Sequence, residues 1–270
     1  MNLNKLNNIA SRIRSDVIKM CYDSKSAHLA SCLSCIDILV AIYWGQLFID
    51  SNDPKNINRD RFIMSKGHAA MALYATLARK GFFPNSWLST YNQDGGILAE
   101  HPPANLIPGV EAATGSLGHG LPIGIGIALA GKIRKLQYKT IILLSDGENN
   151  EGSVWEGAMF AAANKLSNLS VIIDYNKWQA TGRSNEVLQL DPLADKWTAF
   201  GWNTVEVEGH DISILQKTLE DTISLEKPTC IIAHTIKGKG VSFMEDDNNW
   251  HYRVPSENEV ALSLEELKIL

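Results

Sequence analysis

Residues 140–152 read TIILLSDGENNEG, an apolar run that passes directly into a polar turn containing glycine. The β-branched and apolar residues 140–144 predict a buried strand. Gly147 allows backbone N–H groups to approach a ligand, and a helix is expected to start just after it. Ligands of open parallel sheets bind beyond the carboxyl ends of the strands, so this turn is the first candidate for a ligand site.

Segments of helical periodicity alternate with short β-branched runs along the whole chain. This alternation predicts an α/β fold: a mostly parallel sheet with helices on both faces. Composition does not shift along the chain, so we expect one domain over residues 1–270. The expected strands are 61–64, 140–144, 169–174, 204–207 and 229–234. The expected helices are 6–21, 33–48, 69–80, 118–136, 154–166, 212–225 and a terminal helix at 263–267, with a loop-rich segment at 82–110.

Composition limits the classes of partner. The formal net charge is −5 and no run of Lys or Arg forms a basic stripe, which argues against nucleic acid. No apolar stretch reaches the roughly 18 residues that a membrane span needs, and residues 1–9 lack a signal-peptide pattern. We therefore expect a cytoplasmic protein that does not act at a membrane.

The four cysteines give little sign of metal chemistry. Cys32 and Cys35 form a single C-x-x-C pair, whereas a zinc ribbon needs two such pairs. The pair also lies in an apolar segment that is expected to be helical. We therefore expect buried, reduced thiols.

A second polar turn follows the next strand, about thirty residues after the first. Residues 174–178 read DYNKW, so Asp146 and Asn176 should emerge at the same edge of the sheet. A carboxylate oxygen, an amide oxygen and a backbone carbonyl suit a hard Mg²⁺ or Ca²⁺ ion and leave positions for phosphate oxygens. Each turn alone has the composition of ordinary turns. The two together favour a metal site.

The spacing of these two turns resembles the thiamine diphosphate signature, with Ser145 at a position where the family usually has Gly. Other motifs make the resemblance to two-subunit transketolases specific and extend it over essentially the whole chain. These are SKGHA at 65–69, PGVE at 108–111, TGSLG at 114–118, EGSVWE at 151–156, KGKGVSF at 237–243 and WH at 250–251.

The resemblance implies thiamine diphosphate and a divalent ion as cofactors, Mg²⁺ or alternatively Ca²⁺ or Mn²⁺. Asp146 and Asn176 would bind the metal through their side chains, and Trp178 through its carbonyl. Gly147 and Glu148 would meet the diphosphate through backbone N–H groups. The further cofactor contacts that it implies are His68, Gly115, Ser116, Leu117 and His251.

Four of the seven histidines fall on family positions. By the resemblance, His28 and His101 contact substrate oxygens, and His68 and His251 lie near the cofactor phosphates. Imidazole suits proton exchange with sugar hydroxyls near neutral pH. Residues 27–31 read AHLAS where the family prefers glycines, so we expect a narrower pocket around His28. The remaining three, His119, His210 and His234, are expected to be structural or on the surface.

The resemblance also implies a partner. In transketolases the glutamate that activates the aminopyrimidine ring lies on a second α/β domain, which the family's two-subunit members carry on another chain together with a C-terminal domain. Glu151 and Glu156 would lie at the interface, in a carboxylate network linking two cofactors, although acids near a helix start are also favourable on their own. We expect an α2β2 complex that transfers a two-carbon ketol unit from a ketose to an aldose. The catalytic candidates of this chain are His28, His68, His101, Glu151 and Glu156.

The sequence leaves three alternatives open. An α-type chain of another thiamine diphosphate enzyme, a 2-oxoacid dehydrogenase or a carboligase, would carry a similar domain, but SKGHA and TGSLG argue against it. Residues 118–124, GHGLPIG, approach a dinucleotide-binding motif but are one residue too long and follow no clear strand, so a nicotinamide-dependent oxidoreductase has weak support. A binding protein that has kept the fold without catalysis is the third.

Overall fold

The computed structural model describes residues 1–222 and 226–268. Within these residues one parallel sheet has the strand order β1-β2-β3-β5-β4. The sheet was predicted from the sequence, and each expected strand is present to within a residue or two. The strands are β1 (Arg61–Met64), β2 (Thr140–Ser145), β3 (Leu169–Tyr175), β4 (Asn203–Glu208) and β5 (Thr229–His234).

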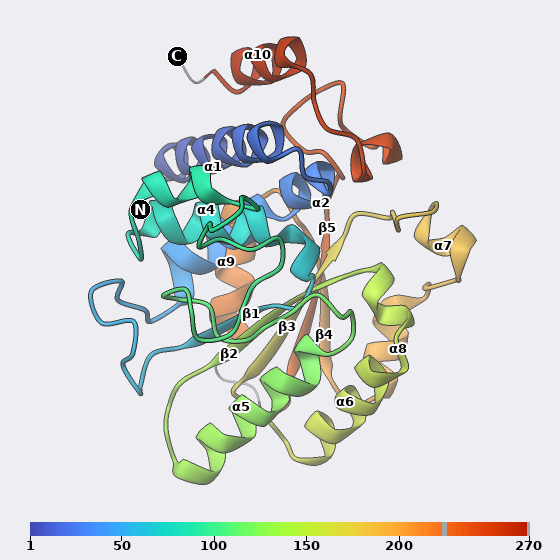
Figure 1. Ribbon diagram of the computed structural model, residues 1–270. Helices are drawn as coiled ribbons and strands as arrows, with labels where there is room; N and C mark the ends of the chain where they lie inside the picture. Colours follow the sequence, from blue (N-terminus) through green and yellow to red (C-terminus); the bar gives the residue numbers. More distant parts are fainter. Residues whose placement is uncertain (223–225, 269–270) are drawn as a thin grey trace.

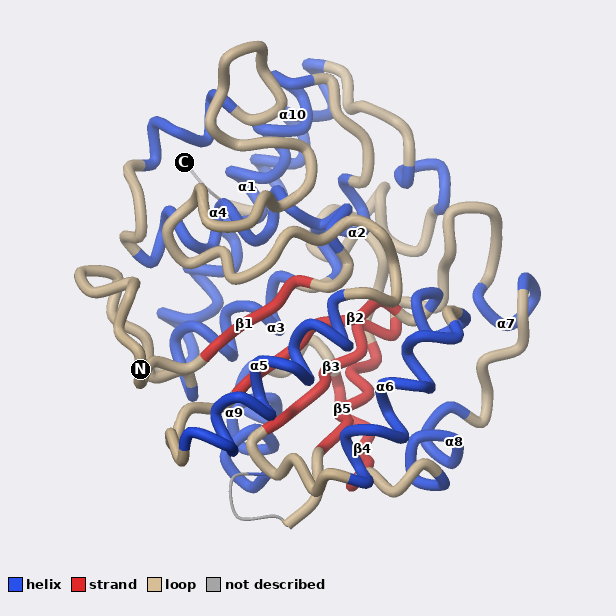
Figure 2. The backbone as a smooth tube through the Cα atoms, turned by 60° about the horizontal axis from the view of Figure 1, so that its bottom comes forward, coloured by secondary structure: helices blue, strands red, loops and turns tan. Residues whose placement is uncertain are grey.

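Helices cover both faces of the sheet, as Figure 2 shows by the helical segments on either side of the strands. One face carries α1 (Leu3–Ser24), α2 (Leu29–Ser34), α3 (Ile36–Ala41), α4 (Ala70–Lys80) and α9 (Ile212–Asp221). The other carries α5 (Gly120–Arg134), α6 (Gly152–Ala163) and α8 (Leu193–Ala199). Two further helices, α7 (Ser184–Val187) and α10 (Glu257–Glu266), lie at the periphery (Figure 1).

Strand β2 shows why helices must cover both faces of the sheet. Ile141 and Leu143 pack into the core under α1 to α4, and Ile142 and Leu144 into the core under α5 and α6. Successive side chains of a strand point to opposite faces of the sheet. An uninterrupted apolar run therefore needs helices packed against both faces. None of the described helices is both long enough and apolar enough to cross a bilayer.

The single helix predicted at 33–48 is wrong, because the segment is divided. Helix α2 ends at Ser34, α3 follows, and a π-helix at Ile42–Gln46 completes the run. The Ser34 hydroxyl donates to the buried carboxylate of Asp174 at 2.6 Å. Helix α2 therefore ends where this carboxylate of β3 needs a hydrogen-bond donor. Breaks and π-turns of this kind are frequent next to functional sites.

Other boundaries differ from the expectations in smaller ways. The helix expected at 212–225 ends at Asp221, and residues 223–225 of that range lie outside the described part of the chain. Helix α10 starts six residues earlier than predicted, where Ser256 and Glu259 form a capping box. Helices α7 and α8 and a 3₁₀ turn at Asn85–Thr90 were not predicted. All four cysteines are buried and free, as expected.

Candidate active site

A cavity of about 380 Å³ lies beyond the carboxyl ends of β2 and β3, at the edge of the sheet where the sequence placed a ligand. Loops after β1, β2 and β3 supply much of its wall. The predicted site residues that line it are His28, His68, His101, Gly115, Leu117, Gly147, Glu151, Asn176, Trp178 and His251. The other lining residues are Ser31, Ser145, Asn150, Gln179, Ala180 and Tyr252.

Four predicted site residues are not part of this wall. Asp146 and Glu148 are fully buried behind the loops that line the cavity. Ser116 is exposed beside the cavity, and Glu156 is exposed on α6. The structure therefore separates the residues that can touch a ligand directly from those that support or surround the site.

Three of the four histidines form one cluster. The ring centroids of His28 and His68 are 5.4 Å apart, those of His28 and His251 are 5.1 Å apart, and those of His68 and His251 are 6.2 Å apart. His28 adopts a left-handed backbone conformation, with φ of 73°, at the start of α2. Its N–H donates to the His251 carbonyl at 2.7 Å, which ties two distant segments together at the cavity.

The cluster is electrically neutral at physiological pH. Burial, followed by the positive charge of Lys237, lowers the pKa of His251 to about 3. Burial is also the main reason why the pKa of His28 is lowered and that of His68 is lowered well below its usual value. Neutral imidazole has one donor and one acceptor nitrogen, so a ring whose acceptor is free can receive a hydroxyl proton, and any of the rings can donate a hydrogen bond.

His101 lines the same cavity and packs against Gly115. A Cβ atom at Gly115 would lie 2.8 Å from the His101 Cδ2 atom, and Gly115 has φ of +148°. Only glycine combines this backbone with such close contact to the ring. The TGSLG segment thus fixes where the His101 ring can lie.

Asp146 is a buried carboxylate in a loop that links two strand ends. Its Oδ1 atom accepts from the Gly147 N–H at 2.8 Å, and its Oδ2 atom accepts from the Lys177 N–H at 2.7 Å and from the Ser184 hydroxyl at 3.0 Å. The Gly147 N–H is thus engaged within the loop. Burial and the charge of Asp174 raise the pKa of Asp146 to about 6. A cation would relieve this excess of negative charge.

The residues around Asp146 fit a divalent ion. A carboxylate has about four lone-pair positions, of which three are used at Asp146. The Asn176 Oδ1 atom accepts one bond, from the Trp178 N–H at 3.0 Å, and retains a second lone pair. Among the described residues no three His, Cys, Asp or Glu side chains gather as a metal site, so a metal here depends on mixed oxygen ligands, as Mg²⁺ and Ca²⁺ accept.

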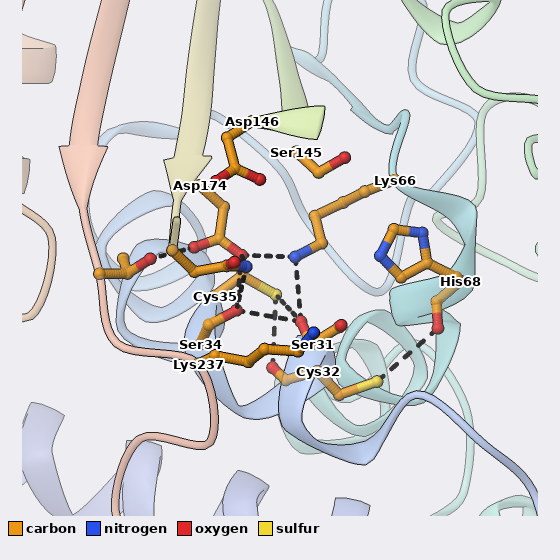
Figure 3. A network of polar contacts seen from close by, with 12 residues as sticks. Ser31, Cys32, Ser34, Cys35, Lys66, His68, Ser145, Asp146, Asp174 and Lys237 are labelled. Carbon is orange, nitrogen blue, oxygen red and sulfur yellow. Dashed lines mark hydrogen bonds and ion pairs between the residues drawn. The ribbon is translucent and has the colours of Figure 1, made fainter. Parts of the chain in front are cut away.

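A buried ion pair stabilises the base of the site, and Figure 3 shows Lys66 extending from its loop toward Asp174. Asp174 also accepts from Ser34 and Thr235, and Lys66 donates to the Ser31 carbonyl at 3.0 Å. Burial alone would raise the pKa of Asp174, but the charge of Lys66 holds it below its usual value. The pair is therefore ionised and joins α2 to the loops after β1 and β5.

Glu148 acts as a second buried connection. Its Oε1 atom accepts from the Ser65 hydroxyl and from the Gly118 N–H at 2.8 Å, and its Oε2 atom accepts from the Ser145 N–H at 3.2 Å. One side chain thus joins the SKGHA, TGSLG and SDGE segments. It aligns three motifs that are far apart in the sequence.

Sequence reasoning missed the side chains of Lys66, Asp174 and Lys237. All three are fully buried, and each lies at the end of a strand or within three residues after it. A charged residue close to the end of a continuous apolar strand is the signal that could have found them, because burying an unpaired charge is costly and implies a partner.

Comparison with known proteins agrees with this geometry. The family model described as "Transketolase, thiamine diphosphate binding domain" matches residues 6–268. The first subunit of an apulose-4-phosphate transketolase from Phocaeicola vulgatus is 41% identical over 255 residues, or 94% of this chain and 90% of that protein. The corresponding protein from Actinobacillus succinogenes is 42% identical over 269 residues, or 99% of this chain and 98% of its own length. The structure of transketolase from Leishmania mexicana aligns with a TM-score of 0.91 at 26% identity; the alignment covers 97% of this chain and 41% of that one.

The fold and the cavity define a thiamine diphosphate-binding domain. The chain belongs to the transketolase family, and it matches the N-terminal, cofactor-binding subunit of split transketolases over its full length. This membership decides against a nicotinamide-dependent oxidoreductase and a 2-oxoacid dehydrogenase subunit. Residues 118–124, which suggested dinucleotide binding, lead from a loop into α5.

Proposed function

We propose that this chain is the cofactor-binding subunit of a cytoplasmic α2β2 transketolase, which moves a two-carbon ketol unit from a ketose to an aldose. The observation that carries the proposal is the cavity in which four histidines meet the loops after β2 and β3. When bound there, thiamine diphosphate supplies a ring carbanion that attacks a carbonyl and then accepts its electrons.

The chain's own residues would bind the metal ion and the diphosphate. Asp146, Asn176 and the Trp178 carbonyl would hold Mg²⁺ at the diphosphate. Neutral His68 and His251 would donate hydrogen bonds to phosphate oxygens in the cavity.

The other two histidines would exchange protons with the substrate. His28 and His101 both line the cavity and would receive and return the protons of sugar hydroxyls. Of the described residues that line the cavity, none is Lys or Arg. A phosphate on the sugar would therefore need cations from the partner subunit.

An apolar surface on α5 and α6 supports the need for a partner. Ile123 and Ile133 on α5 are 40% and 71% exposed, and Met159 and Phe160 on α6 are 54% and 47% exposed. Both helices lie on the same face of the sheet (Figure 2). Several exposed, large apolar side chains on one face of the molecule suggest a protein interface.

The two acidic candidates belong to the same region. Glu151 lines the cavity where α6 begins, and Glu156 is exposed one turn further along that helix. We propose that they face the partner subunit, which would complete the active site with the carboxylate that activates the cofactor. Two relatives are named for apulose-4-phosphate, which makes a phosphorylated ketose the first donor to test.

Metal-dependent cofactor binding tests this function. Asp146→Ala should abolish Mg²⁺-dependent binding of thiamine diphosphate to the reconstituted complex in calorimetry, while the exposed control Asp195→Ala binds normally. Circular dichroism should show the same fold for both variants, because Asp146 lies in a loop at the end of a strand. Equal affinity with and without EDTA, or unchanged affinity in Asp146→Ala, contradicts the metal assignment.

A further inference from the structure

A second charged cluster lies outside the cavity and joins α1, α3 and the loop before α9. Arg14 donates to both carboxylate oxygens of Asp37, at 3.1 and 2.6 Å, and the His210 Nδ1 atom lies 2.7 Å from Asp37. The side chains are 7%, 8% and 11% exposed. Buried ionic groups rarely increase stability over apolar ones, so their presence points to a geometric role.

This cluster holds the turn at residues 236–239, which closely follows β5. The Ile236 N–H donates to the His210 Nε2 atom at 2.8 Å, so Nδ1 carries the ring proton and donates to Asp37. At the other end of the turn, the Lys239 carbonyl accepts from the Arg14 Nε atom at 2.9 Å. Both ends of a four-residue turn are therefore fixed by one network.

Gly240 makes room for the Arg14 side chain beside this turn. It has φ of +97°, and a Cβ atom there would lie 2.8 Å from the Arg14 side chain. Glycine thus allows Arg14 to pass close to the backbone and reach the turn. The Gly238 N–H also donates to the Ala30 carbonyl at 3.0 Å, which attaches the middle of the turn to α2.

Lys237 lies within the turn and connects it to the cavity. Its buried ammonium donates to the Asn248 side-chain carbonyl at 2.6 Å and lies 2.9 Å from the His251 Nδ1 atom. An ammonium group has no acceptor, so Nδ1 of His251 must accept the bond. The proton of the neutral His251 ring is then on Nε2, and this ring lines the cavity.

We propose that Arg14, Asp37 and His210 are positioning residues of the active site: they hold the 236–239 turn so that Lys237 keeps His251 as an Nε2–H donor in the cavity. The role of that donor toward phosphate oxygens rests on the function proposed above. The role of the network in fixing the His251 ring is independent of that function. The network remains ionised at working pH, because the charge of Arg14 and the hydrogen bond from His210 outweigh burial and lower the pKa of Asp37 to about 2.

The tautomer of His251 can be observed without cofactor or partner. We would label the histidines of the full chain with ¹⁵N and record ring spectra at pH 7 for the wild type, His210→Phe and Lys237→Met. In the wild type His251 should show a single Nε2–H tautomer. Both variants should give a mixture of tautomers, and His210→Gln, which keeps an amide donor and acceptor, should restore part of the wild-type signal.

His234→Phe is the matched control, because His234 pairs with Glu206 at a more exposed position, with 37% of its side chain accessible. It should leave the His251 signal unchanged. If His210→Phe does not fold, Lys237→Met still tests the last link of the network. A single Nε2–H tautomer in folded Lys237→Met overturns the proposal, as does a wild-type spectrum in folded His210→Phe.

Kinetics of the reconstituted complex then separate this inference from the proposed function. His210→Phe should lower kcat about tenfold, within the roughly 10²-fold that a displacement of about 1 Å can cause, with a smaller change in the KM of the sugar. A complex of wild-type chains that neither binds thiamine diphosphate nor transfers ketol units refutes the proposed function and leaves the tautomer result standing. Unchanged kcat in His210→Phe with a mixed tautomer refutes the link to catalysis.

Discussion

His101 and Gly115 illustrate how single residues set the shape of the cavity. The ring lies so close to Gly115 that a Cβ atom there would approach Cδ2 to 2.8 Å. His101 lines the same cavity as His28, His68 and His251. We propose for it a role at the reacting carbon rather than at the diphosphate.

His101→Ala should therefore reduce turnover more than cofactor affinity. Loss of one positioned proton-transfer group typically costs about 10²–10⁴-fold in rate. We expect kcat of the reconstituted enzyme to fall within that range while the Kd of thiamine diphosphate changes little. The exposed His119→Ala variant is the control and should behave as wild type. Normal turnover combined with weakened cofactor binding would mean that His101 serves the other end of the cavity.

Asp37 should make the stability of the chain sensitive to acid. Its pKa is about 2 in the folded chain, where the charge of Arg14 outweighs burial, against an ordinary value of 3.8. A lowered pKa stabilises the fold above pH 3.8, and this contribution is lost as the pH falls toward 2. A difference of nearly two pKa units corresponds to about 2 kcal/mol of unfolding free energy.

Urea unfolding between pH 6 and pH 2 measures this contribution. Asp37→Asn should be less stable at pH 6 and should lose less stability than the wild type on acidification, because it has no carboxylate to protonate. The exposed Asp195→Asn should follow the wild-type curve. Parallel curves for Asp37→Asn and the wild type would show that Asp37 contributes no acid sensitivity.

At the scale of elements, the site is made by joining loops that follow different strands. Glu148 connects the segment after β1 and the end of β2 with the loop before α5 through Ser65, Ser145 and Gly118. Each carboxylate oxygen faces a backbone N–H. An amide in place of the carboxylate would present an NH₂ group to one of these donors.

Glu148→Gln should therefore destabilise the fold by about 1–3 kcal/mol, the usual cost of leaving a buried polar group unsatisfied. Chemical denaturation of the isolated chain measures this change. Glu186→Gln, at an exposed position on α7, makes the same chemical change without the buried contacts and should alter stability little. Equal stability of the two variants would show that Glu148 does not hold the loops together.

The sequence predicts the sheet well because its strands are apolar on both faces, as 140–144 shows. It also predicts the strand-end turns and histidines that line the cavity. It does not predict the break in the helix expected at 33–48, since Leu29 to Tyr43 is buried throughout and carries no periodic signal. Pairing of Lys66 with Asp174 could not be predicted either, because 108 positions separate them and only the fold brings them together.

At the scale of the molecule, helix α6 connects the cavity to the exposed apolar side chains of α5 and α6. Helix α6 begins at the cavity, beside Glu151, and continues to the exposed Met159 and Phe160. A second chain that covers this surface would therefore also reach the cavity. The proposed partner would thereby bury apolar area and complete the active site in the same contact.

Phe160→Glu should weaken this assembly, because it places a charge in an apolar contact while the residue is already exposed in the isolated chain. The fold of the variant should be normal by circular dichroism. Light scattering of the chain mixed with its partner should show a heterotetramer for the wild type and dissociated subunits for the variant. Leu262→Glu, at a comparably exposed position on α10, is the control and should assemble normally. Normal assembly of Phe160→Glu would place the interface elsewhere.

The chain purified alone should not transfer ketol units, and a separately purified partner should restore the activity. Of the described acidic residues, Glu151 is the one that lines the cavity, and it lies at the start of α6 beside the proposed diphosphate loop. In the proposed mechanism, the carboxylate for the aminopyrimidine ring would therefore come from outside this subunit. Titration with the partner should raise the rate of ketol transfer until the two chains are equimolar, and then give a plateau. Robust ketol transfer by this chain, freed of any co-purifying protein, would refute the two-subunit proposal.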